Sequence, residues 1–343
     1  MSADSARVEA AIEGRREAVN DAIAEMLPVT RPERLYEASR YLLDAGGKRL
    51  RPAMLLLVAE AVTGVDPLTE DYRAFGPEEI DIMAAAVSVE VIQSFTLIHD
   101  DIMDDDDLRR GVPAVHREYD TETAILAGDT LYSKAFECML QTGAPADRSV
   151  RALEKLATTC TKICEGQALD VAFEARGDVT TEEYLDMVEH KTAVLYAAAA
   201  AIPAVLLGAD EEVVDALCGY GLDVGRAFQI QDDLLDLTTP SERLGKQRGS
   251  DLIEGKRTVV TLHARDQGVD VDALLDTADP ADVTEADIEA AVGRLEGAGS
   301  IDHARTMARE ITDRGKRRLE VLPEGEARET LAGIADYLVE RDY

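Results

Sequence analysis

Apolar residues recur every three to four positions along almost the whole chain, which is the spacing of one face of an α-helix. No segment has the strict alternation of apolar and polar residues that is typical of a half-buried strand. The pattern predicts helices over residues 5–27, 32–45, 52–64, 80–107, 120–140, 148–173, 181–208, 211–237, 256–267, 283–320 and 325–341. Their ends coincide with glycine, proline and polar clusters.

The gaps between these helices lack the length and the Pro-, Gly- and Ser-rich composition of an interdomain linker. We therefore predict one all-α domain over residues 1–343, a bundle of about ten or more helices. Hydrophobic residues make up 46% of the chain and aromatic residues only 4%. That composition is sufficient for a large core built mainly from Ala, Leu, Val and Ile.

The chain carries a net charge of −33 and has 8 Lys against 28 Arg. Such a surface repels phosphate backbones, which argues against nucleic acid as a partner. The acidic residues are spread along the chain rather than gathered in a tail. A diffuse acidic and lysine-poor surface favours a protein that stays dissolved in concentrated salt, so we expect a halophilic cytosol.

Other features of the chain agree with a cytoplasmic location. The N-terminal residues form a polar helix pattern without a signal peptide. The uncharged stretch 192–209 is Ala-rich and contains Pro203, which favours an interior helix over a membrane span. The four cysteines include no CxxC pair, which argues against zinc, and we expect Cys160 and Cys164 to be buried reduced thiols.

Two aspartate clusters of the same form carry the clearest chemical signal. They are Asp100-Asp101-Ile102-Met103-Asp104 and Asp232-Asp233-Leu234-Leu235-Asp236, and each follows a mostly apolar run. On a helix, the first and last aspartates of each cluster lie on the same face, one turn apart. Turned toward each other, two such faces would form a cage of oxygen ligands suited to Mg²⁺, which substrate phosphates would complete.

A single aspartate cluster could be no more than a solvated helix face. Two clusters, each joined to a helix that looks buried, favour metal binding, because carboxylates beside an apolar wall need a partner.

The scarce basic residues point to phosphate. Lys48 and Arg51 stand beside Pro52, which suits the first turn of a helix, and a helix N-terminus favours an anion. Arg109 and Arg110 follow the first aspartate cluster, with Gly111 as the expected helix stop. Half of the lysines lie in these few segments: Lys48, Lys191, Lys246 and Lys256. Carboxylates for Mg²⁺ together with Arg and Lys for phosphate oxygens indicate a site for two diphosphates.

The chain resembles the trans-isoprenyl diphosphate synthases (polyprenyl synthetases), particularly the archaeal geranylgeranyl diphosphate synthases. The resemblance covers nearly the whole chain and rests on five motifs in family order: GGKRLRP, LIHDDIMDDDDLRRG, the HKTA segment, FQIQDDLLD and GSDLIEGKRT. It implies an isoprenoid synthase fold with a central active-site cavity. The implied reaction is condensation of isopentenyl diphosphate with an allylic diphosphate, in a homodimer without membrane insertion.

The resemblance also implies roles for individual residues. Three Mg²⁺ ions would be bound by Asp100, Asp104 and Asp232, with Asp101, Asp233 and Asp236 behind them or acting through water. The allylic diphosphate would be held by Arg109, Lys191, Thr192, Gln229, Lys246 and Lys256. Isopentenyl diphosphate would be held by Lys48, Arg51, Gln93 and Arg110. Thr192 and Gln229 could also direct oxygen dipoles toward the allylic cation.

Product length is expected to depend on the residues below the first aspartates. A bulky Phe95 beside a small Thr96 resembles the archaeal pattern that gives a C20 product, geranylgeranyl diphosphate. Farnesyl and geranylfarnesyl diphosphate remain alternatives.

Three features depart from the family pattern. Gln93 replaces a common His, residues 237–240 lack a common Gly, and the C-terminus 340–343 has no basic tail.

Two other functions remain open from the sequence. A class I terpene cyclase shares the metal-dependent ionisation of an allylic diphosphate, but it would lack the GGKRLRP segment. A non-catalytic partner subunit would not need intact aspartates in both clusters.

Overall fold

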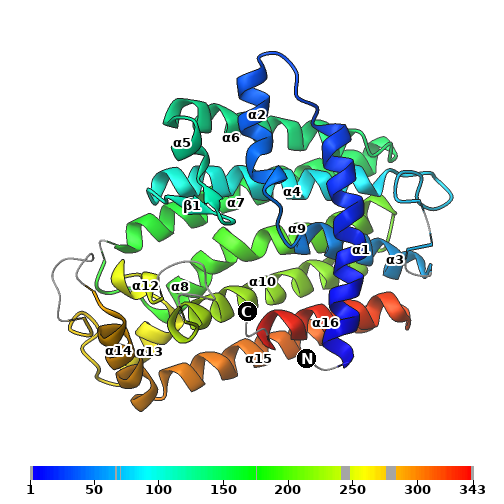
Figure 1. Ribbon diagram of the computed structural model, residues 1–343. Helices are drawn as coiled ribbons and strands as arrows, with labels where there is room; N and C mark the ends of the chain where they lie inside the picture. Colours follow the sequence, from blue (N-terminus) through cyan, green and yellow to red (C-terminus); the bar gives the residue numbers. More distant parts are fainter. Residues whose placement is uncertain are drawn as a thin grey trace. The chain divides into compact units, whose positions relative to one another are not determined.

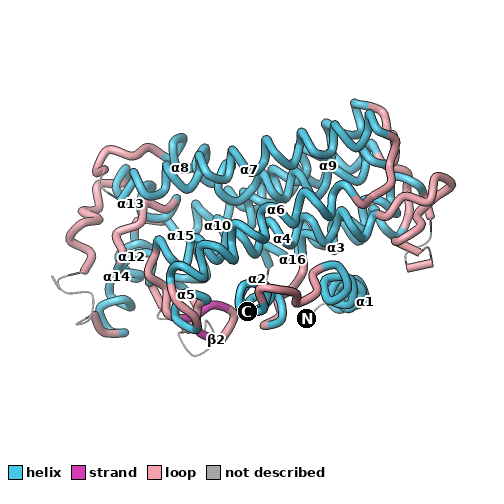
Figure 2. The backbone as a smooth tube through the Cα atoms, turned by 90° about the horizontal axis from the view of Figure 1, so that it is seen from above, coloured by secondary structure: helices cyan, strands magenta, loops and turns pink. Residues whose placement is uncertain are grey.

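The computed structural model describes residues 3–65, 68–69, 71–174, 176–240, 248–275 and 283–340. Nearly every described segment is helical, as the backbone in Figure 2 shows, so the predicted all-α fold is confirmed. The α-helices are α1 (Ala3–Met26), α2 (Glu33–Asp44), α3 (Leu50–Thr63), α4 (Ile82–Met103), α5 (Val115–Glu118), α6 (Thr121–Leu140), α7 (Ala146–Glu174), α8 (Thr181–Val188), α9 (Val194–Leu206), α10 (Glu211–Thr238), α12 (Ser250–Ile253), α13 (Val259–Asp266), α14 (Glu285–Gly297), α15 (Ser300–Arg318) and α16 (Glu326–Glu340).

Three short elements complete the described chain. A π-helical turn, η1 (Glu189–Ala193), separates α8 from α9, and a 3₁₀ turn, η3 (Leu319–Val321), follows α15. Strands β1 (Leu108–Arg109) and β2 (Val112–Pro113) form an antiparallel hairpin in which Leu108 pairs with Pro113.

Three predicted helices differ from the structure, and one of them, predicted over 181–208, is divided by η1 into α8 and α9. The helix predicted over 80–107 ends at Met103, because Asp104 caps it and Asp105 adopts a left-handed backbone with φ 56°. The predicted stop at Gly111 is therefore wrong; Gly111 lies in the β1–β2 turn with φ 78°. The helix predicted over 283–320 is two helices, α14 and α15, separated where Gly299 adopts φ 71°.

The chain divides into two compact units, and the prediction of a single domain over residues 1–343 stays a prediction. The first unit contains residues 1–160, 197–218 and 319–334. Within it, α4 packs along α6 and also contacts α1, α2 and α3 (Figure 1). The first half of α4 is mostly apolar and is buried from Ile82 to Ile92, including Ser88 and Glu90, and the helix carries its aspartates at the other end.

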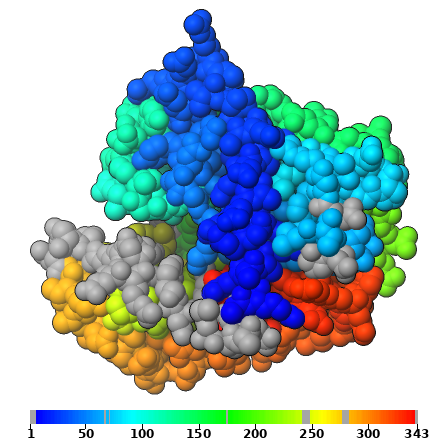
Figure 3. Space-filling view, turned by 45° about the vertical axis from the view of Figure 1, so that its right-hand side comes forward, coloured from blue at the N-terminus to red at the C-terminus, as the bar shows by residue number. Residues whose placement is uncertain are grey.

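Helix α1 attaches to the first unit through polar contacts as well as apolar ones. The guanidinium of Arg15 donates to both carboxylate oxygens of Glu60 in α3, and both side chains are 1% exposed. Tyr72 also donates to Glu60. At the other end of α1, Arg7 pairs with Glu329 over 3.2 Å, and Figure 3 shows the dark-blue helix against the red segment.

The second unit contains residues 161–196, 219–318 and 335–343. Its core is formed by apolar side chains of α8, α10, α13, α14 and α15, including Ile230, Val260 and Leu295. A buried carboxylate, Asp223, receives hydrogen bonds from Arg314 and Arg318 and so joins α10 to α15.

Helix α4 is the one described helix that is long and apolar enough to cross a membrane, but 78% of its apolar window is buried inside the protein. A buried core helix meets the same criteria of length and apolar composition. The uncharged stretch 192–209 forms α9, whose side chains are nearly all buried, so the predicted interior helix is confirmed. Cys160 is a buried thiol outside any disulfide, as expected, whereas the prediction for Cys164 is wrong, because that thiol is exposed.

Candidate active site

The first aspartate cluster forms the last turn of α4. The backbone N–H of Asp104 donates to the carbonyl of Asp100 over 2.8 Å, so these two residues are one helical turn apart. Asp100 is half-buried and Asp104 is exposed, while Asp101 is completely buried. The outer pair is therefore placed where a ligand can reach it, and Asp101 faces the protein.

Asp101 is bound by Arg109. Nε of Arg109 donates to Oδ1 of Asp101 over 2.6 Å, and Nη2 reaches Asp106 over 2.7 Å. Burial raises the pKa of the Asp101 carboxyl, and the charge of Arg109 opposes that rise. The β1–β2 hairpin thus places Arg109 beside the aspartate cluster, and its predicted role in binding diphosphate stays a prediction.

The second predicted diphosphate segment precedes α3. Pro52 lies in the first turn of α3, as predicted, and Arg49 caps the helix with a left-handed backbone. Lys48 is exposed and Arg51 is half-buried. Gly46 and Gly47 have φ values of 97° and 138°, a backbone that glycine adopts without strain.

Arg110 lies against this glycine loop. Its Nη1 donates to the carbonyls of Leu42 and Gly46, and a Cβ on Gly47 would lie 2.9 Å from Cζ of Arg110. Arg110 also pairs with Glu90 of α4 over 3.3 Å, and Arg49 donates to the same carboxylate. Arg110 therefore lies against the loop that directly precedes Lys48 and Arg51 in the sequence.

The remaining predicted residues of the first unit lie on α4. Gln93 is half-buried, one turn after Glu90. Thr96 donates its hydroxyl to the carbonyl of Gln93 over 2.9 Å. The ring of Phe95 packs edge-on against the rings of His99 and Tyr132, with centroid distances of 4.9 and 5.3 Å.

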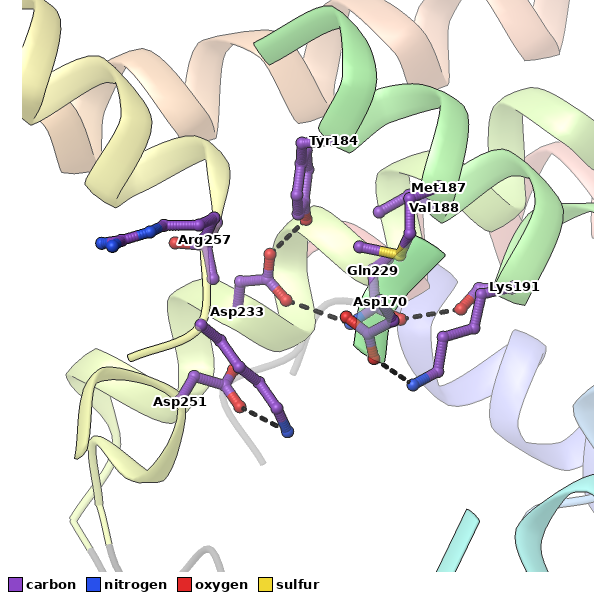
Figure 4. Close-up of a pocket in the computed structure, with 12 residues that line it drawn as sticks. Asp170, Tyr184, Met187, Val188, Lys191, Gln229, Asp233, Asp251 and Arg257 are labelled. Carbon is purple, nitrogen blue, oxygen red and sulfur yellow. Dashed lines mark hydrogen bonds and ion pairs between the residues drawn. The ribbon is translucent and has the colours of Figure 1, made fainter. Parts of the chain in front are cut away.

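The second unit has a cavity of about 90 Å³ with a polar wall (Figure 4). It is lined by Asp170, Tyr184, Met187, Val188, Lys191, Thr192, Gln229, Asp233, Asp251, Lys256, Arg257 and Thr258. Four of these were predicted from the sequence to bind the allylic diphosphate: Lys191, Thr192, Gln229 and Lys256. Lys191 pairs with Asp170 of α7 over 2.5 Å, and Lys256 pairs with Glu254 over 2.8 Å and with Asp251 over 3.8 Å.

A chain of hydrogen bonds crosses the wall of this cavity. The hydroxyl of Thr192 donates to Oε1 of Gln229 over 2.9 Å, and Nε2 of Gln229 donates to Asp233 over 3.0 Å. The buried hydroxyl of Tyr184 donates to the other oxygen of Asp233. Burial raises the pKa of the Asp233 carboxyl, and the charge of Asp251 raises it further. Both oxygens of Asp233 are thus engaged.

The π-helical turn η1 presents Lys191 and Thr192 to the cavity, as π-turns frequently do at functional sites. Two glycines make room for it. A Cβ on Gly166 of α7 would lie 2.2 Å from the backbone nitrogen of Lys191, and a Cβ on Gly225 of α10 would lie 2.4 Å from Cα of Ala193. Helices α7 and α10 therefore approach the turn at contact distance from both sides.

The second aspartate cluster lies in the last turns of α10. Asp232 is half-buried, whereas Asp233 and Asp236 are buried. Asp236 accepts hydrogen bonds from Oγ of Ser250 over 2.8 Å and from the backbone N–H of Asp251 over 3.1 Å. The family resemblance implies that Asp232 binds metal and that the other two act behind it, and this division stays a prediction. Lys246 lies outside the described residues.

Five polar residues that line the cavity were missed by sequence reasoning: Asp170, Tyr184, Asp251, Arg257 and Thr258. Asp251, Arg257 and Thr258 belong to the GSDLIEGKRT motif, which could have indicated them. Asp170 and Tyr184 carry no such signal, because their partners Lys191 and Asp233 are distant in sequence.

The donor chemistry of the aspartates suits a hard cation. Among the described residues, no three His, Cys, Asp or Glu side chains are grouped closely enough to hold a metal ion by themselves. Carboxylate oxygens without a complete protein cage fit Mg²⁺, which usually keeps several waters and is completed by substrate phosphates.

A family model and several known proteins match most of the chain. A family model described as polyprenyl synthetase matches residues 32–295. The chain is 73% identical to a geranylfarnesyl diphosphate synthase of Natronomonas pharaonis and 50% identical to a geranylgeranyl diphosphate synthase of Methanosarcina mazei, covering 98% and 97% of both chains.

Solved structures also match nearly the whole chain. The geranylgeranyl pyrophosphate synthetase of Geoglobus acetivorans superposes with a TM-score of 0.86 and 45% identity, covering 96% of this chain and 99% of that one. A polyprenyl synthase of Caulobacter crescentus, determined with calcium and isoprenyl diphosphate, has a TM-score of 0.84 and 32% identity, covering 99% of this chain and 98% of that one.

Proposed function

The chain belongs to the polyprenyl synthetase family and is a trans-prenyltransferase, and we propose that it condenses isopentenyl diphosphate head-to-tail with dimethylallyl, geranyl and farnesyl diphosphate. The observation that carries this proposal is the cavity in the second unit. It combines cations, Lys191 and Lys256, with a fixed chain of hydrogen-bonding groups from Thr192 to Tyr184. Cations of this kind suit the leaving diphosphate, and the aligned dipoles suit a carbocation.

The metal ligands in this proposal are Asp100, Asp104 and Asp232, binding three Mg²⁺ ions. Support comes from their exposure relative to their neighbours: each is more accessible than the adjacent buried aspartates Asp101 and Asp233. Bound there, Mg²⁺ would act as a Lewis acid for the departing diphosphate.

The residues of the chain itself bind, orient and exclude water. Arg109, Lys191, Lys246 and Lys256 hold the allylic diphosphate, and Lys48, Arg51, Gln93 and Arg110 hold isopentenyl diphosphate. Thr192 and Gln229 direct oxygen dipoles toward the allylic cation that forms when the C–O bond breaks. The double bond of isopentenyl diphosphate attacks this cation, and a proton is then lost to the released pyrophosphate. Positioning and electrostatics account for the acceleration, and no protein base is required.

For the product we propose geranylgeranyl diphosphate, a precursor for isoprenoid and membrane lipid biosynthesis. The aromatic packing of Phe95 with His99 and Tyr132 supports this length, because a bulky ring limits the room for a growing chain. The 73% identical relative is a geranylfarnesyl diphosphate synthase, which favours that product as the second candidate.

We also propose that the protein is a homodimer in a salt-rich cytoplasm. Ile125, Tyr132 and Leu140 lie on one face of α6 and are 42%, 38% and 62% exposed. A second copy of the same helix would be a self-complementary cover for these apolar side chains.

Product analysis tests the proposed function. Purified protein is incubated with Mg²⁺, isopentenyl diphosphate and each allylic primer in turn, and the products are sized by chromatography. Elongation of every primer to a C20 diphosphate is expected. A C25 product would select the second candidate, and failure to incorporate isopentenyl units would contradict the proposal.

A further inference from the structure

A buried carboxylate that no motif indicated lies behind the residues proposed to bind isopentenyl diphosphate. Glu90 is 3% exposed in the middle of the apolar helix α4. It accepts a hydrogen bond from Nη1 of Arg49 and one from Nη2 of Arg110, which is 3.3 Å away. These two arginines belong to different segments, the cap of α3 and the β1–β2 turn.

Both arginines are also anchored beside the glycine loop that precedes Lys48, Arg110 by contacts with that loop and Arg49 by contacts with α1 and α2. Arg49 donates to the carbonyl of Leu43 and to Oδ1 of Asn20, while Arg110 donates to the carbonyls of Leu42 and Gly46. The guanidinium of Arg110 lies flat on Gly47, where even a Cβ would overlap with it. Because both guanidiniums meet at Glu90, this carboxylate fixes the loop from two sides.

The charges of this cluster do not balance. Two guanidiniums share one carboxylate, and their other contacts among the described residues are to neutral oxygens. Burial lowers the pKa of Arg110, and the nearby charges of Arg49 and Arg109 add to this, while Glu90 opposes it. The cluster therefore adds one unit of positive charge beside the cations Lys48 and Arg51, which favours an anion there.

A second buried ion pair of the same unit shows what a balanced arrangement looks like. Glu60 is 1% exposed and pairs with the single guanidinium of Arg15. It also accepts hydrogen bonds from Tyr72 and from the backbone N–H of Leu68, and none of these residues belongs to a predicted site. Both carboxylates are buried and have an arginine partner. They differ in that one guanidinium neutralises Glu60 whereas two face Glu90, and only Glu90 lies beside a predicted binding site.

From this contrast we infer that Glu90 is a positioning residue for isopentenyl diphosphate: it holds Arg49 and Arg110 so that the Gly46–Gly47 loop presents Lys48 and Arg51 to the diphosphate. The inference rests on the proposed function. Removing the charge of Glu90 leaves two buried guanidiniums without a counter-ion, and their repulsion displaces the loop. The loss falls on binding of one substrate, because Glu90 contacts none of the residues proposed for the allylic diphosphate.

The test compares Glu90→Gln with the matched control Glu60→Gln. Thermal unfolding and the KM for each substrate are measured for both variants, with the kinetics well below the lower Tm. We expect both variants to lower Tm, since each breaks a buried ion pair. Only Glu90→Gln should raise the KM for isopentenyl diphosphate, by about tenfold or more, with an unchanged KM for the allylic substrate.

Two results would overturn the inference. One is a Glu90→Gln enzyme with the wild-type KM for isopentenyl diphosphate, and the other is an equal rise in both KM values. If Glu90→Gln does not fold, Glu90→Asp replaces it, because the shorter side chain keeps the charge but cannot reach both arginines; the same split in KM is required. A wild-type protein that does not use isopentenyl diphosphate would instead refute the proposed function.

Discussion

The hydroxyl of Thr192 donates to Oε1 of Gln229 over 2.9 Å, which leaves the lone pairs of the Thr192 oxygen facing away from Gln229. The direction of this bond follows from its neighbour, because the amide nitrogen of Gln229 donates to Asp233. The carboxylate of Asp233 therefore determines, through Gln229, which way the Thr192 hydroxyl points. An oxygen oriented in this way can stabilise positive charge on a bound allylic group.

Replacing Thr192 tests that orientation. Thr192→Val keeps the shape of the side chain but removes the oxygen dipole, so we expect kcat to fall by about tenfold while the KM for isopentenyl diphosphate stays constant. Thr192→Ser is the control, since it keeps the hydroxyl. Steady-state kinetics check both, and equal kcat values for wild type and Thr192→Val would contradict the role.

Tyr184→Phe tests the other end of the chain. The variant removes the buried hydroxyl that donates to Asp233. We expect unfolding free energy to fall by about 1–3 kcal/mol, because one oxygen of a buried carboxylate loses its partner. We also expect a lower kcat, because Gln229 is held less firmly. Chemical denaturation and kinetics measure the two effects; a stable variant with full kcat would show that Tyr184 orients nothing.

Gly225→Ala tests the close approach of α10 to the π-turn. The added Cβ would lie 2.4 Å from Cα of Ala193, so the turn must move, and we expect a loss of stability of about 1–3 kcal/mol together with weaker binding of the allylic diphosphate. Gly293→Ala in α14 is the matched control. No atom lies within 4 Å of its added Cβ, and there we expect stabilisation of about 0.5–1 kcal/mol. Similar behaviour of both variants would contradict the account.

Phe95→Ala tests the determinant of product length. Loss of the ring that packs on His99 and Tyr132 opens space beside α4, so we expect products longer than those of the wild type by chromatography. Phe173→Ala, which removes a buried ring of the second unit, controls for general loosening. An unchanged product distribution in Phe95→Ala would refute the assignment.

Helical periodicity and motif spacing predicted much of this molecule. The apolar runs before Asp100 and Asp232 correctly indicated buried helices that end in carboxylates. Periodicity could not reveal η1, because the residues that follow it, 193–206, are apolar on all sides and so carry no helical phase that an extra residue could shift. The stop at Met103 was also missed, since it depends on the left-handed backbone of Asp105.

The sequence could not indicate which residues form pairs when they are far apart along the chain. Glu90 is a single charge within an apolar run of the sequence, and only the structure shows its contacts with Arg49 and Arg110. In the same way, only the ion pair with Lys191 indicates that Asp170 belongs to the site. A charge buried in a helix indicates that a partner exists but not which residue it is.

The central claim is that both aspartate clusters act on one allylic diphosphate, and calorimetry with an unreactive allylic thiolodiphosphate tests it most directly. Mg²⁺-dependent affinity is measured for the wild type, Asp100→Asn, Asp232→Asn and the double variant, with a chelator as the reference. If both carboxylates serve the same bound ligand, each single variant loses most of the Mg²⁺-dependent affinity and the double variant loses little more. Losses of binding free energy that add up in the double variant would contradict the account, and so would a single variant with wild-type affinity.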